Sequence, residues 1–260
     1  MKLRLLLSND DGLDSPFLPA FAKALAQVAD IKIVVPAREQ SWVGRAYSRH
    51  SEVRVKREEF YGLDCQTITG TPSDCVNIAL GHFYDGNLPD AVVSGLNIGQ
   101  NIALPLLWSS GTFSAAVEGA GWGLPAFAFS MRLEKIYYEY CRLRHGKAPD
   151  ALQQNIDEAS EHASEFVIKC LSEKECKTGE VINVNYPIQY TRANDFKKCV
   201  PATANLRSIY VKGDDGKFDF SYSLGDCTSP NGEITDKECL DNATACYSKI
   251  RICDMQKFSV

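Results

Sequence analysis

Short apolar runs alternate with longer amphipathic segments through the first two thirds of the chain. The apolar runs have the length of buried strands and lie at residues 3–7, 31–35, 90–94, 125–130 and 181–184. The segments with apolar side chains at helical spacing lie at residues 16–28, 71–83, 113–121 and 151–171. Strands that alternate with helices run parallel, with right-handed crossovers. The pattern therefore predicts a doubly wound, Rossmann-like α/β fold with a mostly parallel sheet.

Local signals mark several element boundaries. Pro16 suits the first turn of the first helix, and Thr71-Pro72-Ser73-Asp74 is a capping-box start for the second. Two more strands are expected at 53–55 and 66–68, with Gly62 and Asp64 in the turn between them. Residues 131–150 are charged and rich in tyrosine, which suits a loop or a surface helix.

The pattern changes after about residue 193, where short alternating segments replace the repeat of strands and helices. Residues 208–211 and 218–222 flank Gly213-Asp214-Asp215-Gly216, which predicts a β-hairpin excursion with a solvated acidic turn. We divide the chain into an α/β core with the functional site, 1–190, and a hairpin and C-terminal tail segment, 191–260. The second segment is expected to serve oligomerisation.

Charged residues follow the first predicted strand directly, in Ser8-Asn9-Asp10-Asp11-Gly12. Ligands bind at the carboxyl ends of the strands in an open parallel sheet, so Asp10 and Asp11 are expected to face a crevice. Adjacent carboxylates repel each other, and a divalent cation is the usual counter-charge. The alternative is a solvated turn in which aspartate caps the next helix. The loop 36–48, which contains Ser41, emerges at the same edge.

Two further polar segments belong to this edge. Asn97 and Asn101 follow the strand at 90–94, and their amides offer oxygens to a hard cation or N–H groups to phosphate. Ser110-Gly111-Thr112 begins the next helix, and a helix N-terminus favours phosphate. The alternatives are an Asn/Gly turn and an ordinary helix cap without a ligand.

Composition narrows the class of protein. The 260 residues are 45% hydrophobic, enough for one large domain, and the net charge of −5 gives no general attraction for a nucleic acid polymer. No apolar run is long enough for a membrane span, and the apolar start is too short for a signal peptide, so a cytoplasmic location is expected.

The ten cysteines include no C-x-x-C pair, and we expect reduced thiols. Disulfides within Cys227, Cys239, Cys246 and Cys253 are the alternative for an exported chain.

The motifs together resemble the survival protein SurE family of nucleotidases over roughly residues 1–130. The matching segments are Asn9 to Gly12, Ser41, GTPSDCV at 70–76, PDAVVSGLN at 89–97, Gly99, Asn101 and Ser110 to Thr112. The resemblance implies one divalent metal ion, Mn²⁺ or Mg²⁺, bound by Asp10, Asp11, Ser41 and Asn97. It also implies substrate binding by Asn9, Asn101, Ser110, Gly111 and Thr112, with Asp10 and Asp11 as the catalytic residues.

The activity that this resemblance implies is hydrolysis of a nucleoside monophosphate by attack of a metal-activated water, as a 5′- or 3′-nucleotidase. A homodimer or homotetramer is expected with it. The alternatives are a phosphatase for other phosphate esters or short polyphosphate, and a noncatalytic nucleotide-binding protein. The chain differs from the family at Trp42, where glycine is usual, and in the stretch Ile-Ala-Leu-Pro after Asn101. Trp42 is a candidate to stack on a nucleobase.

Overall fold

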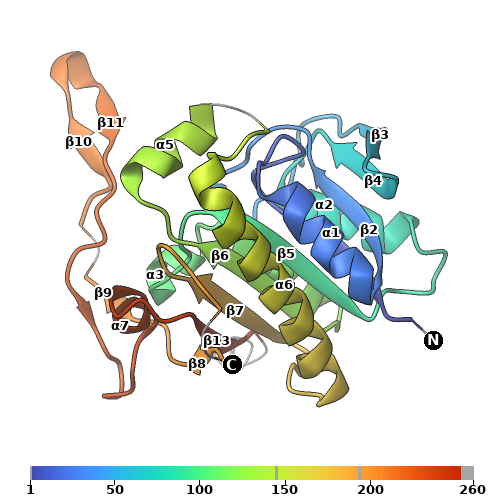
Figure 1. Ribbon diagram of the computed structural model, residues 1–260. Coiled ribbons are helices and arrows are strands. Elements are labelled where there is room, and N and C mark those ends of the chain that lie inside the picture. The colour runs from blue at the N-terminus through green and yellow to red at the C-terminus, as the bar shows by residue number, and fades with distance from the viewer. Residues whose placement is uncertain (1, 144–145, 193–194, 206, 253–260) are drawn as a thin grey trace, which may run out of the picture.

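A nine-stranded sheet with helices on both faces forms the body of the protein (Figure 1). The computed structural model describes residues 2–143, 146–192, 195–205 and 207–252. The strand order is β3-β4-β2-β1-β5-β6-β7-β13-β8, and the pairs from β4 to β7 are parallel. The predicted doubly wound α/β fold is confirmed.

The strands of this sheet are β1 (Arg4–Ser8), β2 (Asp30–Pro36), β3 (Val55–Phe60), β4 (Leu63–Ile68), β5 (Ala91–Ile98), β6 (Ala126–Met131), β7 (Glu180–Tyr186), β8 (Lys197–Lys198) and β13 (Cys246–Arg251). The helices are α1 (Leu18–Val28), α2 (Pro72–His82), α3 (Leu104–Leu107), α4 (Gly111–Gly121), α5 (Lys135–Leu143), α6 (Asp150–Ser172) and α7 (Asp236–Asp241). None of the described helices has the length and apolar character needed to cross a membrane.

Two separate hydrophobic clusters attach the helices to the two faces of the sheet. Leu5 and Leu7 of β1 pack with α1 and α6 on one face, whereas Leu6 packs with α2 and α4 on the other. Successive side chains of a strand point to opposite faces of the sheet. Helices cover both faces of β1, so the side chains on both faces are apolar. This explains the uninterrupted apolar run that the sequence shows there.

Helix α2 begins as its sequence predicts. The Asp74 N–H donates to Thr71 Oγ1 at 3.1 Å, and Asp74 Oδ2 accepts from the Thr71 N–H at 2.9 Å. Both bonds of the capping box are therefore made. The Tyr-rich stretch contains the helix α5.

Three boundaries differ from the sequence prediction. Strand β5 continues through Gly95 to Ile98 and does not end at Ser94, with a shift in pairing to β6 between Ser94 and Asn97. Strand β3 begins only at Val55, and Asp64 lies inside β4 instead of in the turn. Helix α1 begins at Leu18, after Pro16, and Pro19 occupies its first turn.

Gly95 makes the extension of β5 possible. Its φ is +132°, and a Cβ there would lie 2.5 Å from Phe129 O in β6. Only glycine tolerates both the backbone angle and the close approach. A glycine that ordinarily indicates a strand end here marks an irregularity within the strand.

The predicted hairpin is present as β10 (Tyr210–Lys212) and β11 (Phe218–Phe220), and it projects from the body in Figure 1. The turn between them contains the exposed 3₁₀ helix Asp214–Gly216. The same C-terminal segment adds β13 antiparallel to β7. A second small pair joins β9 (Thr203–Ala204) to β12 (Cys227–Thr228).

Candidate active site

A cavity of about 660 Å³ opens at the carboxyl edge of the sheet. The predicted site residues that line it are Asp10, Ser41, Asn97, Asn101 and Ser110. Strands β1 and β5 are parallel neighbours, with Ser8 paired to Ser94, so the residues after both strands reach one edge. The convergence expected from the sequence is therefore present.

Asp10 lies between the start of α4 and the loop after β2. The Thr112 hydroxyl donates a hydrogen bond to Asp10 Oδ1 at 2.5 Å, and the Gln40 N–H donates to Asp10 O at 2.7 Å. Gly111 begins α4, and a Cβ added to it would lie 2.6 Å from Asp10 Cβ and 2.9 Å from Gln40 O. The helix start thus approaches Asp10 more closely than any side chain permits.

Asn9 and Thr112 make structural contacts around the acidic turn. The Asn9 amide nitrogen donates to Gly12 O, and its oxygen accepts from the Gly12 N–H, both at 3.0 Å. Asn9 and Thr112 are fully buried, and the Thr112 hydroxyl is engaged by Asp10. Both side chains therefore hold the Asp10–Asp11 turn in place. Contact of Asn9, Gly111 or Thr112 with substrate stays a prediction.

Asp11 borders a neighbouring cavity of about 370 Å³, which shares Ile98 and Arg142 with the first. Its Oδ2 accepts a hydrogen bond from the Ile98 N–H at 3.1 Å. The extension of β5 provides this donor. Asp10 and Asp11 therefore open onto adjoining spaces at the end of the same strand.

Burial dominates the electrostatics of the two carboxyl groups. It raises the pKa of Asp10 to about 6 against the opposing hydrogen bonds of Thr112. Burial, and then the charge of Asp10, raises the pKa of Asp11 well above its usual range. Arg142 opposes this only weakly, and its guanidinium pairs with Glu39 at 3.9 Å. Asp10 is buried and Asp11 is partly buried, so a bound cation would favour the ionised form of both adjacent carboxyl groups.

The oxygen atoms around Asp10 fit a hard divalent cation. The Ser41 hydroxyl donates its proton to Glu39 Oε1 at 2.8 Å, so its oxygen can still coordinate. The Asn97 amide nitrogen donates to Gly99 O at 3.2 Å, which orients the amide oxygen as its ligand atom. Two carboxylates, a hydroxyl and an amide oxygen are a donor set that Mg²⁺ and Mn²⁺ prefer.

Asn101 and Ser110 are held rigidly at the cavity wall. The Asn101 N–H donates to Asn185 Oδ1 at 2.9 Å, and its side-chain nitrogen donates to Ser130 Oγ at 2.8 Å. Ser110 caps α4 by accepting the Phe113 N–H at 3.0 Å. These contacts tie the cavity wall to β6, β7 and α4.

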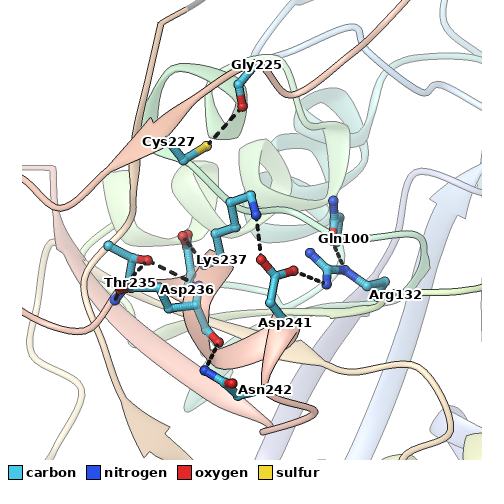
Figure 2. Close-up of polar contacts among 10 residues, drawn as sticks. Gln100, Arg132, Gly225, Cys227, Thr235, Asp236, Lys237, Asp241 and Asn242 are labelled. Carbon is cyan, nitrogen blue, oxygen red and sulfur yellow. Dashed lines mark hydrogen bonds and ion pairs between the residues drawn. The ribbon is translucent and has the colours of Figure 1, made fainter.

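Arg132 is a cavity residue that the sequence reasoning missed. It follows β6, and its guanidinium bonds to Gln100 and, at 2.8 Å, to Asp241 of α7 (Figure 2). Lys237 also pairs with Asp241 in this network. The available signal was its position directly after a parallel strand, at the edge where ligands bind. The arrangement supplies a cationic side chain at the cavity wall.

An aromatic cluster of Trp42, Phe220 and Tyr222 forms another part of the wall. The Trp42 ring lies 5.0 Å from the ring of Phe220 and 5.0 Å from that of Tyr222, measured between centroids. The φ of Trp42 is +61°, a left-handed backbone angle that glycine adopts more readily than tryptophan. Glycine is usual at this position in the family that the sequence resembles. The cluster joins the loop after β2 to strand β11 and the residues that follow it.

Comparisons with known proteins identify a family that matches most of the chain. The family model "Survival protein SurE" matches residues 5–209. The 5′-nucleotidase SurE of Clostridium beijerinckii is 34% identical over 80% of this chain and 77% of its own length. That of Methanococcoides burtonii is 32% identical over 72% of this chain and 69% of its own length.

One relative matches a shorter part of the chain at higher sequence identity. The 5′-nucleotidase SurE of Methanoculleus marisnigri is 42% identical over 52% of this chain, and the match spans half of that relative's length. The crystal structure of the SurE protein from Aquifex aeolicus superposes with a TM-score of 0.74, at 23% identity and 98% coverage of both chains. The family match and the common fold lead to one conclusion: this chain belongs to the survival protein SurE family.

Proposed function

We propose that this protein is a metal-dependent nucleoside monophosphate phosphohydrolase, a 5′- or 3′-nucleotidase. Membership in a family whose curated relatives are named 5′-nucleotidase supports a nucleotide phosphohydrolase. The observation that carries the proposal is the adjacent carboxyl pair: Asp10 is buried in the wall of a cavity that also contains Ser41 and Asn97, and Asp11 is partly buried at the adjoining cavity. That arrangement suits a metal-assisted hydrolysis.

Asp10, Asp11, Ser41 and Asn97 would hold the Mn²⁺ or Mg²⁺ ion. When bound, such an ion acidifies a water molecule and polarises a phosphoryl oxygen. Deprotonated Asp10 and Asp11 attract the cation, and either carboxylate can accept the proton of the attacking water. The Thr112 hydroxyl keeps Asp10 oriented toward this task.

The phosphate is held by donors from the start of α4, from Asn101 and from Arg132. The N-terminus of α4 at Ser110 and Gly111 carries positive dipole charge, and Asn101 offers an amide group. Arg132 adds a full positive charge, held in place by Gln100 and Asp241. Fixed donors of this kind stabilise the phosphoryl charge as the transition state forms.

The aromatic cluster supports a nucleotide as the substrate in preference to a simple phosphate ester. Trp42, Phe220 and Tyr222 present ring surfaces in the same cavity as Asp10. Flat aromatic surfaces stack on nucleobases, worth about 1–3 kcal/mol per base. Short polyphosphate lacks a base and gains nothing from these rings.

The test is phosphate release from a panel of 5′- and 3′-nucleoside monophosphates, p-nitrophenyl phosphate and short polyphosphate, with Mn²⁺, Mg²⁺ or EDTA. We expect metal-dependent release from a nucleotide, and loss of at least about 100-fold in Asp10→Asn and Asp11→Asn. Asp214→Asn in the exposed hairpin turn is the matched control and should behave as wild type. Full activity in EDTA, or in both site variants, would refute the proposal. Tight nucleotide binding without turnover would favour the noncatalytic alternative.

We also propose that the segment 191–260 mediates a homodimer or homotetramer in the cytoplasm. The hairpin exposes Tyr210, Val211 and Phe218, each more than half accessible. Exposed apolar side chains on one projecting element are typical of an interaction surface. Light scattering of wild type and Val211→Ser/Phe218→Ser tests it: an unchanged oligomer, or a monomeric wild type, would refute the role of the hairpin.

A further inference from the structure

Three cysteines from different elements meet at the far edge of the sheet. Cys199 follows β8, Cys239 lies on α7, and Cys246 begins β13. Their Sγ atoms all lie within 4.8 Å of one another. All three residues are buried, with exposures of 6%, 1% and 0%. The fold has therefore gathered three thiols into one enclosed cluster.

The spacing suits ligands around a single ion. Zn²⁺ binds thiolate sulfur at about 2.3 Å, which places two sulfurs of a tetrahedral site about 3.8 Å apart. A disulfide needs sulfurs about 2.05 Å apart, and the cysteines of the described chain are free. Small side-chain adjustments bring all three Sγ atoms onto one ion, whereas a disulfide uses two and leaves the third unpaired.

Two of the three thiols donate hydrogen bonds to backbone carbonyls. The Cys199 and Cys246 thiols contact the carbonyls of Tyr247, at 3.3 Å, and Asp236, at 3.8 Å. A thiolate is the form of cysteine that binds metal. Metal binding therefore has to release these thiol protons.

We propose that Cys199, Cys239 and Cys246 form a binding site for a thiophilic d¹⁰ cation, with Zn²⁺ as its best match. A complex of three thiolates with Zn²⁺ carries one net negative charge in this buried cluster, whereas the same complex with Cu⁺ carries two. Burying less uncompensated charge costs less free energy. The three protein ligands leave a fourth position for water or another small ligand.

The site is separate from the oxygen site at Asp10 and Asp11. Cys239 and Cys246 lie beyond residues 5–209, the part of the chain that matches the family model. The cysteines share no C-x-x-C spacing that would indicate such a site, and they come together only through β13 and α7.

An ion here would fix α7 relative to the sheet. Asp236 on α7 already accepts the N–H groups of Ala103 and Ala202, each at 2.9 Å. At the other end of α7, Asp241 holds Arg132 at the active-site cavity (Figure 2). The bound ion would therefore stabilise the element that positions Arg132.

The experiment uses the full chain in an Asp10→Asn/Asp11→Asn background, which removes the oxygen site. Zn²⁺ is titrated into the reduced protein, and Cd²⁺ is titrated separately to follow the ultraviolet thiolate-to-metal absorption. We expect about one equivalent of each ion, a cadmium–thiolate band, and a higher melting temperature with Zn²⁺. Cys199→Ser, Cys239→Ser and Cys246→Ser should each lose the band and tight Zn²⁺ binding.

Cys227→Ser is the matched control, because Cys227 lies in the same segment outside the cluster, and it should retain both signals. Cys199→Ala serves as a second variant, since Cys199 is the most accessible of the three, and circular dichroism verifies its fold. A wild-type chain without the band, or a folded Cys199→Ala with unchanged binding, would overturn the proposal. So would mass spectrometry after alkylation that shows a disulfide within the cluster. None of these results depends on nucleotidase activity.

Discussion

Gly111→Ala is the sharpest test of how the start of α4 is fitted to Asp10. The added Cβ would lie 2.6 Å from Asp10 Cβ, against about 3.4 Å for an ordinary contact, so Asp10 or the helix start must move by about 0.8 Å. Neither neighbour can move easily, because Thr112 holds Asp10 and Gln40 O lies 2.9 Å from the same Cβ. A misplacement near 1 Å in an active site costs about 100-fold in rate.

The expected result is a fall of about 100-fold in kcat for phosphate release, with weaker metal binding. Overpacking should lower the stability by about 1–3 kcal/mol. Gly121→Ala at the other end of α4 is the matched control, because its Cβ meets only Arg45 Nη2 at 3.7 Å. Steady-state kinetics, a metal titration and thermal unfolding measure these effects. Wild-type kcat and melting temperature in a folded Gly111→Ala would refute the close-approach argument.

Three further outcomes are expected. Thr112→Val removes the hydrogen bond to Asp10, and should lower kcat about tenfold while raising the pH at which activity rises, measured in a pH–rate profile. Trp42→Ala removes ring surface from the cavity, and should raise KM for a nucleotide about tenfold but leave any hydrolysis of short polyphosphate, which has no ring to stack, unchanged. Burial lowers the pKa of His162 from the ordinary value of 6.5 to about 4 in the folded chain. Between pH 6.5 and 4 the unfolded chain therefore binds one proton more than the folded chain at this residue. About 1–3 kcal/mol of stability should be lost as the pH falls through that range. Urea unfolding at several pH values measures this loss, and His162→Phe should reduce its slope.

The features that rest on interactions between neighbours along the chain could be predicted from the sequence. The Thr71–Asp74 capping box forms because its groups are neighbours along the chain, and the acidic pair follows β1 because an apolar strand ends there. Parallel pairing then places Asn97 and Asn101 at the same edge as Asp10. Pattern and connectivity were sufficient for the parallel strands and for Asp10, Asn97 and Asn101 near their ends, but they did not predict Arg132 after β6 or the strands β8 and β13.

The contacts between side chains across that edge could be seen only in the folded chain. Folding placed the Thr112 hydroxyl on Asp10, required Gly111 to lack a side chain, and brought Trp42 against the hairpin. These contacts join segments that are far apart along the chain, so no local spacing encodes them. The three-cysteine cluster has the same origin, because β13 returns beside β7 and places Cys246 next to α7. Long-range packing, which depends on the whole sheet, therefore set the details on which the proposed chemistry depends.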